Sequence, residues 1–339
     1  MNDRVKSEIP FVGLHAHSVA GSLFDALGYP PDHMDFCYEN GGDALALTDH
    51  GNANGLSHQV LHAKKMKEEG KNFKPIFGTE AYFIPSISDW RKEYEKALED
   101  KKRAKTLGSE LSGATVEDEN SSKKVQDVLR RRRHLILLAQ NQTGLQNIFK
   151  LISESYKSEN FYRYPRMDYD LLAKYGEGVI AASACLGGVY SGNYWENREA
   201  GEEAVLQAMR ETTRKMMSIF GDRWYGELQW NNVPEQHIIN KFIIQMHKEF
   251  GIGLVSTADS HYPSKDAWKD RELYKRLGWL GKAAPSYEST ELPIGVDEIG
   301  YELYPKNGDQ MWESYKKYSE ECGVDYDDDI VMKSITHTH

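Results

Sequence analysis

Short apolar segments alternate with longer stretches of helical spacing along most of this chain. Seven of the apolar segments are brief and rich in Val, Ile, Leu, Phe and Ala, as strands covered on both faces are. They occupy residues 11–14, 44–48, 75–77, 135–139, 178–182, 224–228 and 253–257. Stretches with helical spacing lie between them, notably 59–69, 144–156, 200–220 and 235–250. The pattern predicts strands that alternate with helices.

This alternation predicts a parallel sheet with helices packed on its outer face. Seven strand–helix units without a glycine-rich phosphate loop favour a closed barrel over an open dinucleotide-binding sheet. We therefore expect an α/β protein whose sheet closes on itself, with its chemistry at the ends of the strands.

Two regions interrupt the alternation. Residues 88–133 are almost entirely polar, and we interpret them as a long insertion, part helix and part mobile loop, with little apolar surface to bury. Four consecutive arginines, 130–133, end the insertion and form either a solvated edge or a phosphate-contacting patch at the mouth of a site. Near the C-terminus we expect a strand-turn over 301–312, a helix over 313–322 and a solvated polar tail over 325–339.

Composition and charge narrow the class of protein. The 339 residues are 40% hydrophobic and 28% charged, a globular balance, and no run of 18 apolar residues predicts a membrane span. The first residues lack the apolar core of a signal peptide, and three cysteines do not suggest a disulfide framework, so a cytoplasmic location is expected. A net charge of −10 speaks against wrapping a duplex, but not against a site that takes one strand end beside bound cations.

Metal-competent side chains gather at the ends of the predicted strands. Two pairs, His15 with His17 and Asp259 with His261, are spaced two apart and so face one side of an extended chain. The full set in chain order is His15, His17, Asp49, His50, Glu80, Cys185, Asp259 and His261. His134 is ambiguous by position because it begins a strand. Taken singly, each histidine is more simply a hydrogen-bonded core or surface residue, and Cys185 a small buried hydrophobe.

Histidine nitrogens combined with carboxylate oxygens suit Zn, Mn or Fe better than Mg or Ca alone. The candidates also exceed what one tetrahedral ion needs, so the sequence predicts two or three divalent metals. Such centres hold a hydroxide and neutralise phosphate oxygens, which is the chemistry of phosphate-ester hydrolysis.

The segments that carry these residues resemble the PHP (polymerase and histidinol phosphatase) domain at the N-terminus of bacterial DNA polymerase III alpha subunits. The similarity runs from residue 11 to 304 and includes Leu14-His15-Ala16-His17-Ser18, 45–52, 74–82, 134–147, 184–187 and 257–262. The resemblance implies a distorted seven-stranded (β/α)7 barrel in a metallophosphoesterase domain over 1–285, with the insertion at about 88–133. A C-terminal extension over 286–339 would lead toward a polymerase region.

Matched residue by residue, the resemblance implies nine ligands for up to three metals: His15, His17, Asp25, His50, Glu80, His134, Cys185, Asp259 and His261. Asp25 is where the pattern departs, because its spacing from His17 is one residue longer than in the family. Barrel closure should bring the first and last strands together, so that their ligands share metals. Catalytic roles are expected for Asp49, His50, Glu80 and Asp259, with Asp49 orienting a ligand or the attacking water.

A complete ligand set in this family accompanies Mn- or Zn-dependent 3′–5′ exonuclease activity used in proofreading during DNA replication. The leading hypothesis is therefore hydrolysis of DNA 3′ ends, as part of or alongside a polymerase III alpha-like catalytic polypeptide, with no polymerase activity in this chain. A small-molecule or nucleotide phosphatase would use the same centre. A third hypothesis is a non-catalytic polymerase domain that metals stabilise.

Overall fold

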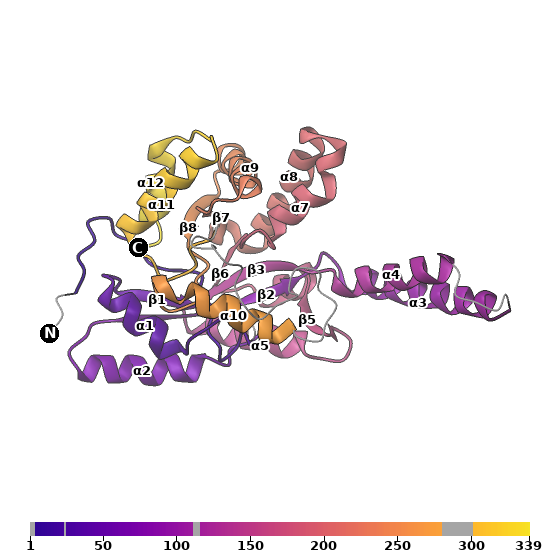
Figure 1. Ribbon diagram of the computed structural model, residues 1–339, viewed down its shortest axis with the longest axis horizontal. Helices are drawn as coiled ribbons and strands as arrows, with labels where there is room; N and C mark the ends of the chain where they lie inside the picture. The colour runs from indigo at the N-terminus through magenta and orange to yellow at the C-terminus, as the bar shows by residue number, and fades with distance from the viewer. Residues whose placement is uncertain (1–3, 24, 111–115, 280–300) are drawn as a thin grey trace.

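A computed structural model describes residues 4–23, 25–110, 116–279 and 301–339 of the chain. Its strands form one curled sheet with the order β4-β5-β2-β3-β6-β7-β8, and β1 pairs with β2 (Figure 1). The strands are β1 Ala44–Leu47, β2 Lys74–Phe83, β3 Arg133–Ala139, β4 Phe161–Tyr162, β5 Tyr164–Met167, β6 Val179–Ala182, β7 Trp224–Gln229 and β8 Gly253–Thr257. The short β4–β5 pair is an addition that the apolar pattern did not predict.

The segment before β1 closes this sheet into a barrel. One parallel bridge joins Gly13 to β1, and another joins Ala16 to Ser260, just after β8. The amide of Ser260 also donates to the carbonyl of His15 at 3.0 Å. The strand predicted over residues 11–14 is thus only one isolated bridge at Gly13, and the second bridge lies just beyond it at Ala16. The predicted distorted barrel and its seam between first and last segments are confirmed.

The sheet is mixed, so the expectation of an all-parallel sheet is wrong. β3 runs antiparallel to both β2 and β6, whereas β1–β2, β2–β5, β6–β7 and β7–β8 are parallel. The cause is the connection between β2 and β3. It is a helical hairpin that leaves and returns at one edge of the sheet, so β3 begins where β2 ends.

That hairpin, here named the arm, consists of α3 Ile87–Glu110 and α4 Val116–Arg130, and it projects away from the barrel (Figure 1). Apolar side chains from its two helices and the end of β2 form a small core of their own: Ile84, Ile87, Trp90, Ala97, Val125, Val128 and Leu129. The Trp90 indole N–H also donates to the carbonyl of Val128 at 2.8 Å. The described residues of the arm are helices that bury an apolar core, so the expected helical part is present and the expectation of little buried apolar surface is wrong. Residues 111–115, within the expected loop, lie outside the described part of the chain.

Most of the other helices cover the outer face of the barrel. They are α1 Pro30–Glu39, α2 Leu56–Glu68, α5 Gln142–Ser155, α6 Tyr169–Tyr175, α7 Val189–Asn197, α8 Glu202–Phe220 and α9 Pro234–Phe250, whereas α10 Trp268–Trp279 lies at the barrel mouth. Of these helices, α2, α5, α8 and α9 are the four that the spacing predicted. In α5, Ile148 and Leu151 lie one helical turn apart and are buried against the sheet. Asn141 caps this helix by accepting from the amide of Gly144 at 3.0 Å. Among the described residues, no helix has the length and apolarity to cross a bilayer.

The C-terminal region packs on the barrel instead of forming the predicted tail. After an extended stretch over 301–307 come α11 Gly308–Glu321 and α12 Asp328–Thr336. Val331 and Ile335 on α12 are fully buried, and Thr338 accepts from the backbone amide of Val12 at 2.9 Å. The expected strand-turn is absent from 301–307, and only the acidic turn before α12 is solvated as expected. The proposed domain boundary at 285/286 lies outside the described residues.

Candidate metal centre

Nine metal-competent side chains meet at one end of the barrel, and we name this set the mouth cluster. Its members are His15, His17, Asp25, His50, Glu80, His134, Cys185, Asp259 and His261. They come from the closing segment, the loop after it, the ends of β1, β6 and β8, the second half of β2 and the start of β3. The antiparallel course of β3 explains His134, because this strand begins at the edge where the parallel strands end.

The seam of the barrel forms the inner part of the cluster. His15 Nε2 lies 3.0 Å from His17 Nε2, and Asp259 Oδ1 lies 3.0 Å from the first of these nitrogens and 3.2 Å from the second. Glu80 Oε2 lies 3.2 Å from His17 Nε2 and 3.7 Å from His15 Nε2. Ligand atoms around a tetrahedral ion 2.0–2.1 Å away are about 3.4 Å apart. His15, His17 and Glu80 therefore fit one ion of that size, and Asp259 lies against the same two histidine nitrogens.

A second group lies toward the loop that carries Asp25. Ligand atoms of His17, His50 and His261 lie within 4.8 Å of one another. Asp25 Oδ2 lies 2.8 Å from His50 Nε2 and 3.3 Å from His261 Nε2, so it adds a carboxylate to the three imidazoles. Arg271 on α10 holds this carboxylate in place, since its Nη2 donates to Asp25 Oδ1 at 2.9 Å.

A third group surrounds the Glu80 carboxylate, with members at both of its oxygens. His134 Nδ1 lies 2.6 Å from Glu80 Oε1, and His50 Nδ1 lies 2.7 Å from Glu80 Oε2. Cys185 Sγ is 3.6 Å from His134 Nδ1 and 4.0 Å from Glu80 Oε1. Any two of the three groups share one side chain, which is His17, His50 or Glu80. Shared side chains are what a centre of several adjacent ions requires.

Several buried atoms of the cluster have no hydrogen-bond partner, although they lie in close contact. They are His50 Nδ1, Glu80 Oε2 and Asp259 Oδ1. A buried polar atom without a partner costs stability, so such atoms are rare in folded proteins. Cations between these nitrogens and oxygens would satisfy all three atoms. The donor set, imidazole with carboxylate and one thiol, is also one that Zn, Mn and Fe accept. The residues present therefore fit a metal centre.

The histidines differ in how they respond to these surroundings. Burial lowers the pKa of His50, but Glu80 and Asp25 outweigh it and raise that pKa to about 10. Burial, together with the neighbouring His50 and His261, lowers the pKa of His17 to about 3. His17 is thus neutral and offers a lone pair, whereas a proton on His50 balances the carboxylates that a cation would otherwise balance.

The carboxylates of the cluster are ionised in spite of their burial. Burial raises the pKa of Glu80, but His134 and His50 lower it well below the ordinary value. Burial likewise raises the pKa of Asp259, and the histidines around it, His15 foremost, bring it well below that value. The barrel mouth therefore presents fixed negative charge to a cation.

Two backbone positions beside the cluster adopt left-handed geometry without being glycine. Ala184, immediately before Cys185, has φ 60°, and Asp259 has φ 48°. Non-glycine residues pay a steric cost in this region, and such strain is concentrated at functional sites. Here it turns the side chains after β6 and β8 toward the barrel mouth.

Supporting residues orient the ligands, and the sequence analysis did not single out Glu227, Ser22 or Arg271. Glu227 on β7 is buried and lies 2.7 Å from His15 Nδ1, which leaves His15 Nε2 facing the cluster. Ser22 connects His17 to Asp49, with contacts of 3.2 Å to His17 Nδ1 and 2.8 Å to Asp49 Oδ1. The signal for Glu227 was an acidic residue within an otherwise apolar strand.

Asp49 faces the loop that carries Ser18 and Ser22, away from the ligand atoms of the cluster. Its carboxylate accepts from Ser18 N at 2.7 Å, Ser18 Oγ at 3.0 Å and Ser22 Oγ at 2.8 Å. Burial raises the pKa of Asp49, and these hydrogen bonds partly oppose the rise. Its geometry fits the expected orienting role better than direct contact with a reacting water.

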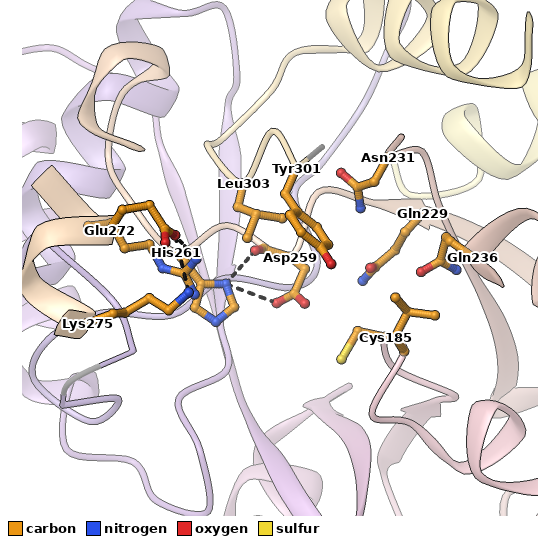
Figure 2. A pocket seen from close by; sticks show the side chains of 12 residues that line it. Cys185, Gln229, Asn231, Gln236, Asp259, His261, Glu272, Lys275, Tyr301 and Leu303 are labelled. Carbon is orange, nitrogen blue, oxygen red and sulfur yellow. Dashed lines mark hydrogen bonds and ion pairs between the residues drawn. The ribbon is translucent and has the colours of Figure 1, made fainter. Parts of the chain in front are cut away.

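A cavity of about 640 Å³ opens directly beside the cluster. Figure 2 shows Asp259 between two walls, with His261, Glu272 and Lys275 on one side and Cys185 with three amide side chains on the other. The amides are Gln229, Asn231 and Gln236. Gln236 is 2% exposed, and its Oε1 has no hydrogen-bond partner. The cavity thus combines a metal-competent floor with a wall of neutral hydrogen-bonding groups.

The geometry defines a mixed β/α barrel with a histidine–carboxylate cluster at its mouth. A family model for the PHP domain matches residues 13–231, more than half of the chain, and the chain belongs to that family. It is 37% identical over 252 residues to the DNA polymerase III subunit alpha of Aquifex aeolicus, covering 74% of this chain and 18% of the relative. It is 30% identical over 311 residues to the DNA polymerase III subunit alpha of Borreliella burgdorferi, covering 91% of this chain and 22% of that relative.

The chain therefore spans about a fifth of the length of these curated relatives. Among solved structures, it is similar to an amidohydrolase from Chromobacterium violaceum, with 14% sequence identity and a TM-score of 0.37. That similarity covers 78% of this chain and 96% of the amidohydrolase.

Proposed function

We propose that this chain is a metal-dependent phosphodiesterase that removes nucleotides from DNA 3′ ends, a 3′–5′ exonuclease of the proofreading type. The mouth cluster supports this proposal most, because its three ligand groups share side chains and open onto one cavity. The similarity to DNA polymerase III alpha subunits favours DNA as substrate. It also favours a role within or alongside a polymerase III alpha-like polypeptide.

The nine side chains of the mouth cluster would hold two or three divalent ions, of Zn, Mn or Fe. When bound, such ions supply an activated water as nucleophile and neutralise the charge of phosphate oxygens. Glu80 is central to the proposal, since one of its oxygens faces His15, His17 and His50 and the other faces His134. Cys185, beside His134, would bind the more peripheral ion, because soft sulfur suits Zn whereas the hydrolytic pair of ions is better served by harder ligands.

The protein groups divide the remaining work between them. Asp259 belongs to the cluster and also lines the cavity, so its carboxylate is placed to accept the proton of the attacking water. Glu80 keeps a negative charge at the reacting centre, and His50 supplies an imidazole ligand there. Asp49 acts as a positioning residue, because it holds the loop through Ser18 and Ser22.

The cavity is suited to the released nucleotide. Its volume falls in the range of small-molecule sites, about 300–1,000 Å³. Gln229, Asn231 and Gln236 present amide groups to a base, while the other wall carries Arg271 and Lys275 in ion pairs with Asp25 and Glu272. The same features favour a second function, a nucleotide phosphatase, which the net charge of −10 also suits better than it suits a duplex-binding enzyme. A non-catalytic domain that metals stabilise would leave the cavity without a use.

One experiment separates these functions. The purified chain is incubated with Mn²⁺ and a primer labelled at its 3′ end, and separately with p-nitrophenyl phosphate, before and after chelation. The exonuclease proposal predicts stepwise loss of 3′ nucleotides that chelation stops and that Asp259→Asn abolishes. Asp222→Asn, an exposed residue in the turn before β7, serves as the matched control. Turnover of p-nitrophenyl phosphate alone would favour the phosphatase, and turnover of neither substrate would contradict both enzymes.

A further inference from the structure

The four arginines at the end of the arm do not share one role. Arg131 lies 2.6 Å from Glu93, and Arg133 forms an ion pair with Glu196. Arg132 has no acidic partner in the part of the chain that the structure describes. Its Nε is buried and has no hydrogen-bond partner. Arg130 has no acidic partner among the described residues either, but it is exposed to solvent, so Arg132 is the member of the run that combines an unpaired charge with a partly buried guanidinium.

Arg132 lies on two tyrosine rings next to the mouth cluster. Its guanidinium carbon is 3.9 Å from the ring centre of Tyr164 and 5.4 Å from that of Tyr82. The Tyr82 ring lies 6.0 Å from that of His50, nearly parallel at 14°, and 5.6 Å from that of His134. A single aromatic ring thus separates this cation from two proposed metal ligands.

Hydrogen bonds from Arg166 fix the backbone just before Arg132. Arg166 is fully buried, and it donates to the carbonyls of Leu129 and, at 3.2 Å, Arg131. Its guanidinium carbon lies 4.2 Å from the ring centre of Trp90 in the core of the arm. The residues just before Arg132 cannot shift without breaking these bonds, so its position next to Tyr164 is set before any ligand arrives.

Such an arrangement suits a nucleic-acid strand better than a small phosphate ester. A guanidinium binds phosphate oxygens in a planar fork, and tyrosine rings stack on bases of any sequence. The cavity reaches the cluster at Cys185, Asp259 and His261, whereas the tyrosines meet it at the rings of His50 and His134, which do not line the cavity. Two separate places beside one centre allow one nucleotide to occupy the cavity while its neighbours lie on the rings.

We propose that Arg132, Tyr164 and Tyr82 bind a single-stranded polynucleotide on the side of the scissile bond away from the cavity. Arg132 contacts a backbone phosphate, and the tyrosines stack against the adjacent bases. This inference rests on the proposed function, whose substrate class it names: a chain of nucleotides and not a mononucleotide.

The test compares binding and hydrolysis in three variants of the full chain. Binding of a 5′-fluorescent oligothymidylate is followed by anisotropy in EDTA, where no hydrolysis occurs, over a series of salt concentrations. Hydrolysis with Mn²⁺ is measured on the same oligothymidylate and on bis(p-nitrophenyl) phosphate. The variants are Arg132→Gln, Arg132→Lys and, as the matched control from the same run, Arg131→Gln.

We expect Arg132→Gln to weaken oligothymidylate binding about tenfold and to reduce the slope of log Kd against log salt by about 0.7, the loss of one phosphate contact. The ratio of kcat/KM for oligothymidylate to that for bis(p-nitrophenyl) phosphate should fall about tenfold. Arg132→Lys should lie between this variant and the wild type, because it keeps the charge but not the planar fork. Arg131→Gln should bind as the wild type does, since Glu93 already occupies that side chain.

Wild-type affinity in Arg132→Gln would overturn the inference, as would an equal loss in Arg131→Gln, which would show only unspecific charge. Failure of the wild type to bind oligothymidylate would overturn it as well. Failure to hydrolyse bis(p-nitrophenyl) phosphate bears instead on the proposed function, because the anisotropy measurement does not depend on catalysis.

Discussion

The barrel mouth and the arm are both rich in charge, but they place it in opposite ways. The mouth cluster buries its charge: His15, His17 and Glu80 have side chains at most 1% exposed. The arm keeps its charges in solvent, as in the pair of Lys92 with Asp89, whose side chains are 75% and 67% exposed. The interior of the arm is apolar and includes Trp90 in the first turn of α3.

This difference shows which of the two regions contributes to the stability of the fold. Exposed ion pairs contribute little to stability, so the arm depends on its apolar core. Buried ionised groups cost several kcal/mol unless they are fully compensated, and well-packed apolar residues in their place are often at least as stable. The mouth therefore retains side chains that stability alone would not favour. We conclude that packing determines the side chains in the core of the arm, whereas chemistry determines those at the mouth.

The largest effect is expected from the side chain that all parts of the mouth contact. Glu80→Gln removes the charge shared among His15, His17, His50 and His134, and should lower kcat/KM for bis(p-nitrophenyl) phosphate at least about a thousandfold, or about 4 kcal/mol. Steady-state kinetics with Mn²⁺ measures this loss, and the far-ultraviolet circular dichroism should remain that of the wild type. Activity within tenfold of the wild type would remove Glu80 from the centre.

A substitution in the core of the arm should lower local stability, whereas the substitution in the mouth lowers activity. Trp90→Ala empties the core of the arm and should cost about 3–5 kcal/mol of local stability. Hydrogen exchange should accelerate in α3 and α4 but not in β6, β7 or β8, because the arm has a core of its own. Lys92→Ala, exposed on the same helix, is the control and should not change exchange. Equal acceleration in the barrel strands would show that the two regions are one cooperative unit.

Metal should stabilise the mouth directly. A cation that binds only the folded chain adds about 2.7 kcal/mol at a free concentration one hundred times its dissociation constant. We expect the melting temperature to rise with added Mn²⁺ or Zn²⁺ and to return to its starting value with EDTA. Glu80→Gln should show a much smaller rise at the same concentrations. A melting temperature in the wild type that ignores both metal and chelator would contradict a cation site.

A buried histidine outside the cluster should give the smallest effect. Burial lowers the pKa of His33 to about 4, and its Nε2 lies 2.9 Å from the carbonyl of Leu27. The pKa of His33 in the folded chain lies below its unfolded value of about 6.5. The free energy of unfolding is therefore undiminished above pH 6.5 and decreases as the pH falls toward 4, because the unfolded chain then binds the proton more readily. Between pH 7 and pH 5 the loss is about 2 kcal/mol.

His33→Gln should remove that part of the acid sensitivity, as urea unfolding of the metal-free protein at the two pH values would show. Arg4→Gln, at a half-exposed ion pair with Asp43, provides a control that should keep the wild-type difference between pH 7 and pH 5. An unchanged pH dependence in His33→Gln would mean that this imidazole is protonated in the folded chain.

The ligands that a short sequence pattern defines were predictable, and those that depend on topology were not. His15 with His17 and Asp259 with His261 follow from the two-residue repeat of an extended chain. His134 did not follow from its position, because no local signal shows that β3 runs antiparallel to its neighbours. Its place among the candidates came from the family resemblance.

The arm shows a different limit of sequence reading. Its mean composition is polar, which suggested a segment of part helix and part mobile loop with little to bury, but Trp90, Tyr94 and Ala97 recur at spacings of four and three residues on α3. A few apolar residues at helical spacing are enough when a second helix covers them. Composition averaged over the whole insertion concealed that stripe.

The central claim is that the barrel mouth is a centre for several metal ions, and elemental analysis tests it most directly. The chain is purified in the presence of Mn²⁺ and Zn²⁺ without chelator, dialysed to remove unbound metal and analysed for metal content per chain. The geometry of three ligand groups that share His17, His50 and Glu80 predicts two or three ions per chain. A content of one ion or fewer, in protein that is folded by circular dichroism, would contradict the account.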